Sequence, residues 1–557
     1  MKLGRLFCLL TVLLSGCRDL GLLNPPIIDT DRRPPWQPYY GSEVYTNPIL
    51  FADYSDPDVV RVGDYFYLTS SSFNCVPGLP ILRSRDLLSW TIIGHALPKL
   101  VPEEHYNKVQ IGGGVWAPSI RFHAGKFYIF YPDPDYGIYM VTATDPAGEW
   151  SAPVLVKAGR GLEDPCPLWD DDGKVYLVHA LVASRIGRNN ALVLNQLSPD
   201  ATKTIDDGHD IIAGTQFGIT GLEGPKFYKL NGYYWIFAPV GGVTGGTQAV
   251  FRSKSIEGPY EMRIVLAQGK TKVNGPHQGA LVNMPDGKEW WFIHFQDAGV
   301  YGRIDHLEPV KWKADGWPVI GNDPDNSGTG EPVTTLTRPI ITLKMFENQL
   351  QDYAPKISDN FNGPNLGLQW QWQANPQDNW YSLSTNPDHL RLYSQPANPN
   401  FVRQPNLLLQ KLSGPNCDVS TIMTFFPAEI GERAGVVVWG NPCYWAGLVK
   451  TADGLRLSIC VCRVSASGDV TIESELKGSR ATSNNVHFNL DLGGTGENGY
   501  LRVEEVGKPG IESYFAFTAI HGSWIGAKFG LFAIRPATSK TTGYADFEGV
   551  QLSQGTN

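Results

Sequence analysis

FADYSDPDVVRVGDYFYLTSSSF, residues 51–73, joins an acidic turn to a strand pattern. Asp56 stands in a Ser-Asp-Pro-Asp turn, and a run rich in Val, Tyr and Phe follows at once. Because Pro57 restricts the residue before it, we expect Asp56 to be extended, with its carboxylate held at the entrance of a strand. The alternative is a turn aspartate that hydrogen-bonds to its own backbone.

The same arrangement occurs twice more in the chain. Asp164 lies in GLEDPCPLWDDDGKVYLVHA, residues 161–180, and Glu223 lies in TGLEGPKFYKLNGYYWIFAPVGG, residues 220–242. Each acidic residue stands just before a proline, directly or across one glycine, and just ahead of a hairpin signal. A solvated charge has no reason to occupy that place three times. The repetition therefore predicts one site built by the inner ends of several sheets.

A turn followed by an aromatic-rich strand recurs about every fifty to sixty residues, a spacing typical of propeller blades. The copies are GDYFYLTS from Gly63, GKFYIFY from Gly125, GKVYLVH from Gly173, NGYYWIFA from Asn231 and DGKEWWFIHF from Asp286. A β-sandwich also contains many short strands, but it would not space one phrase so evenly. The repeats predict a five-bladed β-propeller over residues 47–320.

The rest of the chain lacks this repeat and has a different composition and strand pattern. Residues 321–355 have the composition of a linker, and alternating strand patterns such as RAGVVVWG and YLRVEEV fill residues 356–557. We expect this second region to be a two-sheet β-sandwich of the jelly-roll type. The predicted fold class is thus all-β, a propeller followed by a sandwich.

Composition narrows the function. A chain of 557 residues is too long for one core. Its net charge of -9, with no basic run, argues against nucleic acid as a partner. The 16 tryptophans suit a sugar or another flat ligand, although aromatic side chains also fill β cores.

The N-terminus predicts export and lipidation. Residues 1–17 form a short signal that ends in Leu-Ser-Gly-Cys, which indicates cleavage before Cys17 and lipidation of its thiol. The alternative is an ordinary signal peptide that contains a cysteine. Residues 18–46 are polar and proline-rich, as a tether would be. We expect a bacterial membrane-anchored lipoprotein, periplasmic or on the cell surface.

Six cysteines remain once Cys8 is removed with the signal and Cys17 is lipidated. They show no CxxC spacing and no nearby pair of histidines, which argues against a zinc site. We expect most of them to be small buried apolar residues.

With these motifs in view, the chain resembles glycoside hydrolase family 43, the five-bladed propeller arabinofuranosidases and β-xylosidases, in the form with a C-terminal concanavalin-like sandwich. The resemblance covers nearly the whole mature chain. It rests on NPILFADYSDPDVV, GVWAPSI, LEDPCPLWDDDGKVYLV, GLEGPKFYK, PHQGALVNMPDGKEWWFIHF, DNFNGPNLGLQWQW and ADFEGV. The family usually has Tyr-Pro-Asp-Pro where this chain has Tyr-Ser-Asp-Pro, but Asp56 itself is present.

The resemblance assigns roles to the three carboxylates. Asp56 matches the general base, Glu223 the general acid, and Asp164 the third carboxylate, which orients the acid and raises its pKa. Hydrolysis of a glycosidic bond needs one protonated and one ionised carboxyl group across the bond, which agrees with this assignment.

The resemblance also implies residues around the sugar. Arg303 resembles the arginine that contacts the sugar, and His277 resembles the histidine near the propeller axis. Phe73 and Trp116 look like walls of the sugar pocket, although plain packing between blades is the alternative. We also expect the sandwich to lend a loop that closes one side of the pocket.

No cofactor is expected for the chemistry, but similar sandwiches hold a structural calcium. Asp359 in the first strand and Asp546 in the last are expected to meet at one edge and supply oxygen ligands for Ca²⁺. The alternative is two surface turn residues.

We therefore expect an exo-acting, inverting glycoside hydrolase that releases terminal α-L-arabinofuranosyl residues from plant cell-wall poly- or oligosaccharides, such as xyloglucan or arabinoxylan. A β-D-xylosidase of the same mechanism and an endo-acting arabinanase are alternatives among enzymes. A glycan-binding lipoprotein without catalysis is the alternative of another class, and the presence of both the acid and the base argues against it.

Overall fold

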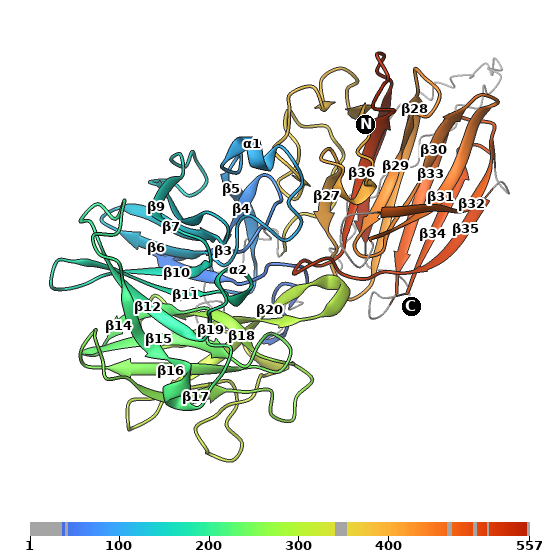
Figure 1. Cartoon of the computed structure of the whole chain (residues 1–557). Helices are drawn as coiled ribbons and strands as arrows, with labels where there is room; N and C mark the ends of the chain where they lie inside the picture. The colour runs from blue at the N-terminus through green and yellow to red at the C-terminus, as the bar shows by residue number, and fades with distance from the viewer. Residues whose placement is uncertain are drawn as a thin grey trace, which may run out of the picture. The chain divides into compact units, whose positions relative to one another are not determined.

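The computed structural model describes residues 36–38, 43–339, 354–464, 471–493, 498–508 and 512–553, and nearly every element in them is a β-strand (Figure 1). The predicted signal peptide, the lipidation at Cys17 and most of the tether lie outside these residues. Within the described ranges, no helix is both long enough and apolar enough to cross a membrane.

The first region contains five antiparallel sheets, each of four strands that are paired in chain order. The strands are β2 (Asp58–Val62), β3 (Tyr65–Thr69), β4 (Gly78–Ser84) and β5 (Thr91–Leu97); β6 (Ser119–His123), β7 (Lys126–Asp133), β8 (Gly137–Ala143) and β9 (Val154–Ala158); β10 (Leu162–Trp169), β11 (Val175–Leu181), β12 (Ala191–Leu197) and β13 (His209–Ala213); β14 (Lys226–Leu230), β15 (Tyr233–Val240), β16 (Thr247–Ser253) and β17 (Glu261–Leu266); β18 (His277–Asn283), β19 (Trp290–Asp297), β20 (Arg303–Trp312) and β21 (Pro318–Ile320). The predicted five-bladed propeller is confirmed.

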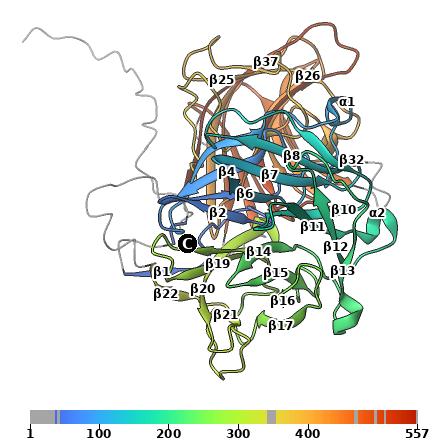
Figure 2. The ribbon, with the colours of Figure 1, turned by 90° about the vertical axis from the view of Figure 1, so that its left-hand side faces the viewer.

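The first strands of the blades form a ring. β2 contacts both β6 and β18, and β10 contacts both β6 and β14. Four of these strands, β2, β6, β10 and β14, are labelled in Figure 2. A short pair outside the blades, β1 (Val44–Thr46) with β22 (Thr335–Thr337), joins the segment before the first blade to the one after the last. The entrances of the first strands therefore converge, and the three predicted carboxylates precede or begin such strands.

Apolar clusters between neighbouring blades make up the propeller core. One cluster joins Ile81 of the first blade to Ile129 of the second, and another joins Phe237 of the fourth blade to Phe292 of the fifth. Each blade is thus buried on both faces, which explains why the aromatic strands read as nearly continuous apolar runs. This packing gives the strand ends that carry the site a rigid support.

The second region is a sandwich of two mainly antiparallel sheets, one with eight strands and one with seven. The eight-stranded sheet contains β23 (Gln371–Trp372), β26 (Gln395–Pro396), β27 (Leu408–Lys411), β29 (Arg433–Trp439), β30 (Cys443–Thr451), β31 (Gly454–Val464), β32 (Thr471–Ala481) and β36 (Lys528–Arg535). The other contains β24 (Tyr381–Ser382), β25 (Leu390–Tyr393), β28 (Cys417–Phe426), β33 (Asn485–Leu492), β34 (Asn498–Glu505), β35 (Glu512–Thr518) and β37 (Tyr544–Ser553). The prediction of a β-sandwich is confirmed.

Helical elements in the described residues are short. They are α1 (Glu103–Tyr106), α2 (Ala183–Ile186) and the 3₁₀ turns η1 (Gly214–Phe217), η2 (Gly299–Tyr301) and η3 (Phe401–Arg403). The six described cysteines are all buried and free, as expected for small apolar residues.

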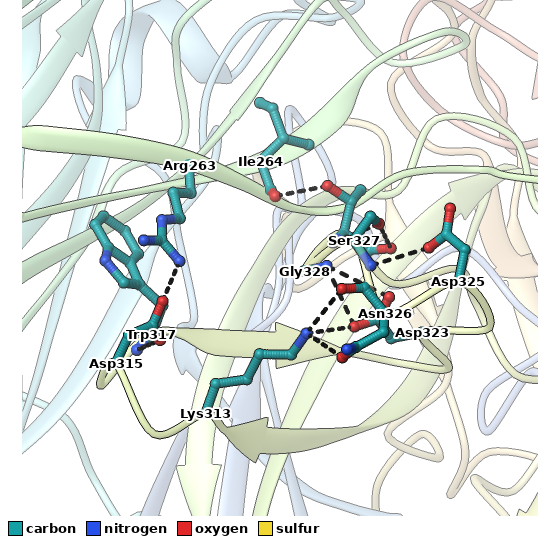
Figure 3. A network of polar contacts seen from close by, with 11 residues as sticks. Arg263, Ile264, Lys313, Asp315, Trp317, Asp323, Asp325, Asn326, Ser327 and Gly328 are labelled. Carbon is teal, nitrogen blue, oxygen red and sulfur yellow. Dashed lines mark hydrogen bonds and ion pairs between the residues drawn. The ribbon is translucent and has the colours of Figure 1, made fainter.

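The segment after the last blade is fixed to the propeller by polar contacts. Lys313 donates to Asp323 at 2.8 Å and to the side chain of Asn326 at 2.9 Å, and nearby Arg263 pairs with Asp315 at 2.6 Å (Figure 3). The first part of the predicted linker therefore lies against the fifth blade. Residues 340–353 are outside the described ranges.

Backbone and side-chain hydrogen bonds join the sandwich to the propeller. Trp372 and Val76 exchange backbone hydrogen bonds of 2.6 and 2.9 Å. Lys411 donates to the carbonyl oxygen of Asp53 at 2.5 Å, and the backbone N–H of Gly526 donates to the carboxylate of Asp53 at 3.0 Å. The contact from Gly526 holds the loop between β35 and β36 against the propeller.

Candidate active site

A cavity of about 780 Å³ lies where the inner ends of the blades meet, and all seven residues predicted for catalysis and sugar binding line it. They are Asp56, Phe73, Trp116, Asp164, Glu223, His277 and Arg303. They come from different blades and lie far apart in the sequence. The propeller, not any local motif, brings them together.

Asp56 is fixed by two partners. Arg303 donates from Nη1 to Oδ1 at 2.8 Å, and the hydroxyl of Ser71 donates to Oδ2. The expectation that Asp56 is extended is wrong, since its φ is +57°. The restriction imposed by Pro57 is a preference only, and these hydrogen bonds hold the backbone in the less populated region.

Asp164 also has a positive φ, +54°, and is 6% exposed. Its Oδ2 accepts a 2.8 Å hydrogen bond from the backbone N–H of Gly224. Burial, and then the negative charges of Glu223 and Asp56, raise the pKa of Asp164 to about 7. This carboxyl group is therefore half protonated near neutral pH.

Glu223 is held by His277, whose Nε2 lies 2.7 Å from its Oε1. Burial raises the pKa of Glu223, but the hydrogen bond from His277 and the charges of His277 and Arg303 outweigh burial and leave it below its ordinary value. The expected rise in the pKa of Glu223 under the influence of Asp164 is thus not found. Of this pair, Asp164 is therefore the group at which protonation is favoured.

The position after Glu223, Gly224, has room only for glycine. Its φ is +59°, and a Cβ there would lie 2.9 Å from Cγ of Gln278 and 3.0 Å from Cδ of Pro239. The chain can therefore turn toward Asp164 only without a side chain at this position.

Two aromatic residues form walls of the cavity. Phe73 exchanges backbone hydrogen bonds with Val115, which anchors this wall to the approach to the second blade. The indole N–H of Trp116 donates to the carbonyl of Gly112 at 2.8 Å, and the guanidinium of Arg185 lies 5.6 Å from the centre of its ring. Phe73 is 4% exposed and Trp116 is half-buried, so the second offers more surface to a ligand.

The sandwich contributes a wall as expected, through residues 521–525 of the loop between β35 and β36. Trp524 is 55% exposed and lies with its ring centre 5.9 Å from the Arg303 guanidinium. Gly526 passes so close to the propeller that a Cβ would lie 2.7 Å from the N atom of Gly302. The particular residue that closes the site, Trp524, was not predicted, because no pattern around it indicates which loop reaches the propeller.

Glu163 is a second lining residue that the sequence did not single out. It directly precedes Asp164 in β10, and regular alternation predicts opposite faces for two neighbouring residues. Burial, and then the charges of Asp164, Glu223 and Asp56, raise its pKa well above the ordinary value. With Asp297, which also lines it, the cavity therefore holds five carboxyl groups instead of the three predicted.

The two aspartates of the predicted calcium pair have different partners. Asp359 accepts hydrogen bonds from the backbone N–H of Phe361 and Gly367 and from the indole N–H of Trp370, at 2.9–3.0 Å. Asp546 forms two 2.7 Å hydrogen bonds with Arg391. In the described part of the chain, no group of three or more His, Cys, Asp or Glu side chains is placed to hold a metal ion. The calcium site stays a prediction that these contacts do not support.

The arrangement suits acid–base chemistry on a bond placed between carboxyl groups. One carboxylate is fixed by an arginine, one is held by a histidine, and two neighbouring carboxyl groups favour the protonated state. Hydrolysis of a glycosidic bond requires such a division between an ionised and a protonated carboxyl group.

Comparison with known proteins agrees with this reading. The model for glycosyl hydrolases family 43 matches residues 45–318, and that for the beta xylosidase C-terminal concanavalin A-like domain matches residues 358–553. A putative beta-xylosidase from Xylanibacter ruminicola is 41% identical over 74% of this chain and 74% of its own length. A non-reducing end alpha-L-arabinofuranosidase from Bacteroides ovatus is 32% identical over 75% of this chain and 78% of its own.

Among solved structures, a GH43B protein of a Bacteroides ovatus xyloglucan locus superposes with a TM-score of 0.75 at 26% identity. The alignment covers 91% of this chain and 99% of that protein. The two domains thus occur together in that relative too.

Proposed function

Since the chain belongs to family 43 of the glycosyl hydrolases and is a glycosidase, we propose that it is an exo-acting α-L-arabinofuranosidase. It releases terminal α-L-arabinofuranosyl residues from plant cell-wall glycans, such as xyloglucan or arabinoxylan. The observation that carries the exo mode is the wall that residues 521–525 of the sandwich add to the cavity. A cavity closed on that side suits a chain end better than the middle of a polymer.

The choice of arabinose is supported by the relative from Bacteroides ovatus that is named an alpha-L-arabinofuranosidase, and by the xyloglucan locus named for the solved structure. A β-D-xylosidase is the second candidate, because the relative with 41% identity carries that name. Both sugars present similar hydroxyl groups, so the shape of the pocket decides between them.

In the proposed mechanism Asp56 activates the attacking water. Arg303 and Ser71 hold its carboxylate in place at the cavity. The water attacks the anomeric carbon while the glycosidic oxygen departs from the opposite face, so the configuration inverts in a single displacement.

Glu223 protonates the departing oxygen. Because His277 lowers the pKa of Glu223 while burial raises that of Asp164, protonation in the free site is favoured at Asp164. The proton must lie on Glu223 when the bond breaks. We propose that substrate binding moves it there, since excluding water disfavours a charged Glu223.

Kinetics on two substrates test the function. The wild-type protein is assayed on p-nitrophenyl α-L-arabinofuranoside and on p-nitrophenyl β-D-xylopyranoside, and kcat/KM is compared. The proposal expects kcat/KM to be at least tenfold higher on the arabinoside. A higher value on the xyloside would establish the second candidate, and an internal cut in a linear arabinan would refute the exo mode.

The lipid anchor is a separate part of the proposal. It is supported by the Leu-Ser-Gly-Cys sequence that ends at Cys17, which lies outside the described residues. We propose that the mature protein is held by this cysteine at a bacterial membrane, periplasmic or on the cell surface. Expressed in a bacterium, the full chain should partition into detergent, and Cys17→Ala should not; equal partitioning would refute the anchor.

A further inference from the structure

The backbone of β10 aims two adjacent side chains into the same cavity. In a regular strand, neighbouring residues point to opposite faces. Here the register between β10 and β11 shifts between Glu163 and Cys166, and Asp164 has a φ of +54°. Such an irregularity redirects side chains and is found next to active sites. Glu163 and Asp164 therefore both line the cavity.

Glu163 differs from the other four carboxyl groups of the cavity in what binds it. Asp56 has Arg303, Asp164 has the N–H of Gly224, Glu223 has His277, and Asp297 has the N–H of Gly299. Glu163 is only 5% exposed, yet in the described part of the chain its carboxyl group has no hydrogen bond or ion pair. A buried polar group without a partner costs about 1–3 kcal/mol, so this group is available to a ligand.

Arg185, the cation whose charge lowers the pKa of Glu163, is already engaged by other partners. Arg185 donates to Asp135 at 2.9 Å and to Ser184 at 3.1 Å. Its guanidinium therefore lowers the pKa of Glu163 only as the last of five influences, after burial and three carboxylates. The surroundings of Glu163 raise its pKa and so favour its neutral form, and a neutral carboxyl group can both donate and accept a hydrogen bond.

We propose that Glu163 is a sugar-binding residue, whose carboxyl group hydrogen-bonds a hydroxyl of the pentose that the cavity holds between Asp56 and Glu223. A sugar hydroxyl is both donor and acceptor and so matches a neutral carboxyl group. Glu163 thereby contributes to the selection of the sugar. This inference rests on the proposed function and deepens it.

The test is a thermodynamic cycle that combines variants of Glu163 with sugars that each lack one hydroxyl group. Inhibition constants are measured for the free pentose that the wild-type enzyme releases and for its singly deoxygenated analogues, with wild type, Glu163→Ala and Glu163→Gln. Wild type should bind one deoxy analogue about tenfold more weakly than the parent sugar. Glu163→Ala should bind the parent sugar about tenfold more weakly and should no longer distinguish that analogue from it.

Glu163→Gln is the matched control, because it keeps the length, the neutral charge and both hydrogen-bonding functions. It should bind the parent sugar within about threefold of wild type. If Glu163→Ala loses affinity equally for every analogue, or loses none, Glu163 does not bind the sugar. If the Gln variant is as weak as the Ala variant, a neutral carboxyl contact is refuted.

A failure of the Glu163 proposal can be told apart from a failure of the proposed function. The cycle uses whichever pentose the enzyme releases, so a preference for xylose would refute the arabinofuranosidase and leave the cycle unchanged. Should the protein hydrolyse neither glycoside, calorimetric titration of L-arabinose and D-xylose replaces inhibition. Unfolding temperatures of both variants establish that affinity changes come from folded protein.

Discussion

The sequence suggested a ligand-binding role for carboxylates in both the propeller and the sandwich, yet the structure uses the two sets differently. In the propeller, Asp56 and Asp164 have positive φ values and face a cavity. In the sandwich, Asp359 binds the backbone of its own turn, and Asp546 pairs with Arg391. The propeller pair has strained backbone and faces the cavity. The sandwich pair is bound by hydrogen-bond donors of the fold itself.

This difference shows that the surroundings of an acidic residue, and not the residue type, decide whether it serves a site or stabilises the fold. Strained backbone persists only where the surrounding structure imposes it, and such residues gather at active sites. Mutations should therefore affect activity in the propeller and stability in the sandwich.

The largest effect is expected for Asp56→Asn. The change removes the base but keeps the shape of the side chain, so kcat should fall by about 10² to 10⁴ on every substrate. Steady-state kinetics on the natural oligosaccharide and on the nitrophenyl glycoside measure the loss. Stability should fall by only about 1–2 kcal/mol, because Arg303 loses its ionised partner. Retained turnover in a preparation free of wild type would refute the role.

Glu223→Gln should lower kcat/KM by an amount that depends on the leaving group of the substrate. A sugar alkoxide leaves poorly and needs a proton, whereas p-nitrophenolate is stable as an anion. The loss should therefore approach the upper part of the range of about 10² to 10⁴ on an oligosaccharide and be clearly smaller on the nitrophenyl glycoside. Parallel kcat/KM measurements decide. Asp56→Asn is the matched control, because it should show no such division, and an equal loss on both substrates would assign Glu223 to positioning.

Much of this site was predictable because the propeller repeats a local signal. A turn followed by an aromatic strand marks each blade, and the three acidic residues before a proline mark blade entrances. Once the number of blades is known, their convergence follows from the ring. The resemblance to a known family placed Arg303 and His277, which local patterns alone would not have placed.

What the sequence did not predict depends on distant pairing or on irregular backbone. Glu163 was missed because the irregularity that turns it into the cavity leaves no mark in the residue pattern. Arg391 and Asp546 are 155 residues apart, and only the register of β25 with β37 brings them together. The low pKa of Glu223 likewise depends on His277, which comes from the next blade.

Asp164→Asn should make the protein more stable at high pH. The folded state raises the pKa of Asp164 from 3.8 to about 7, so it binds the proton more tightly than the unfolded chain does. Stability from this group is therefore present at low pH and falls as pH rises from about 4 to about 7. The variant lacks that loss of stability. The difference between its free energy of unfolding and that of wild type should therefore be about 2 kcal/mol more favourable to the variant at pH 8 than at pH 5.

Urea unfolding at the two pH values measures this advantage, and kcat should fall in the same variant. The combination of higher stability and lower activity is expected where a site keeps charges buried for function. A variant that is destabilised equally at both pH values would show instead that Asp164 supports the fold through the N–H of Gly224.

The smallest effect is expected for Asp546→Asn in the sandwich. The change leaves Arg391, which is 15% exposed in its side chain, without an ionised partner, and stability should fall by about 1–2 kcal/mol. The kcat on the nitrophenyl glycoside should stay that of wild type, because no described contact links this pair to the cavity. Chelation sharpens the test. If Asp546 held Ca²⁺, EDTA would lower the unfolding temperature of wild type and leave that of the variant unchanged. An arginine partner predicts the same response to EDTA in both proteins, with the variant less stable throughout.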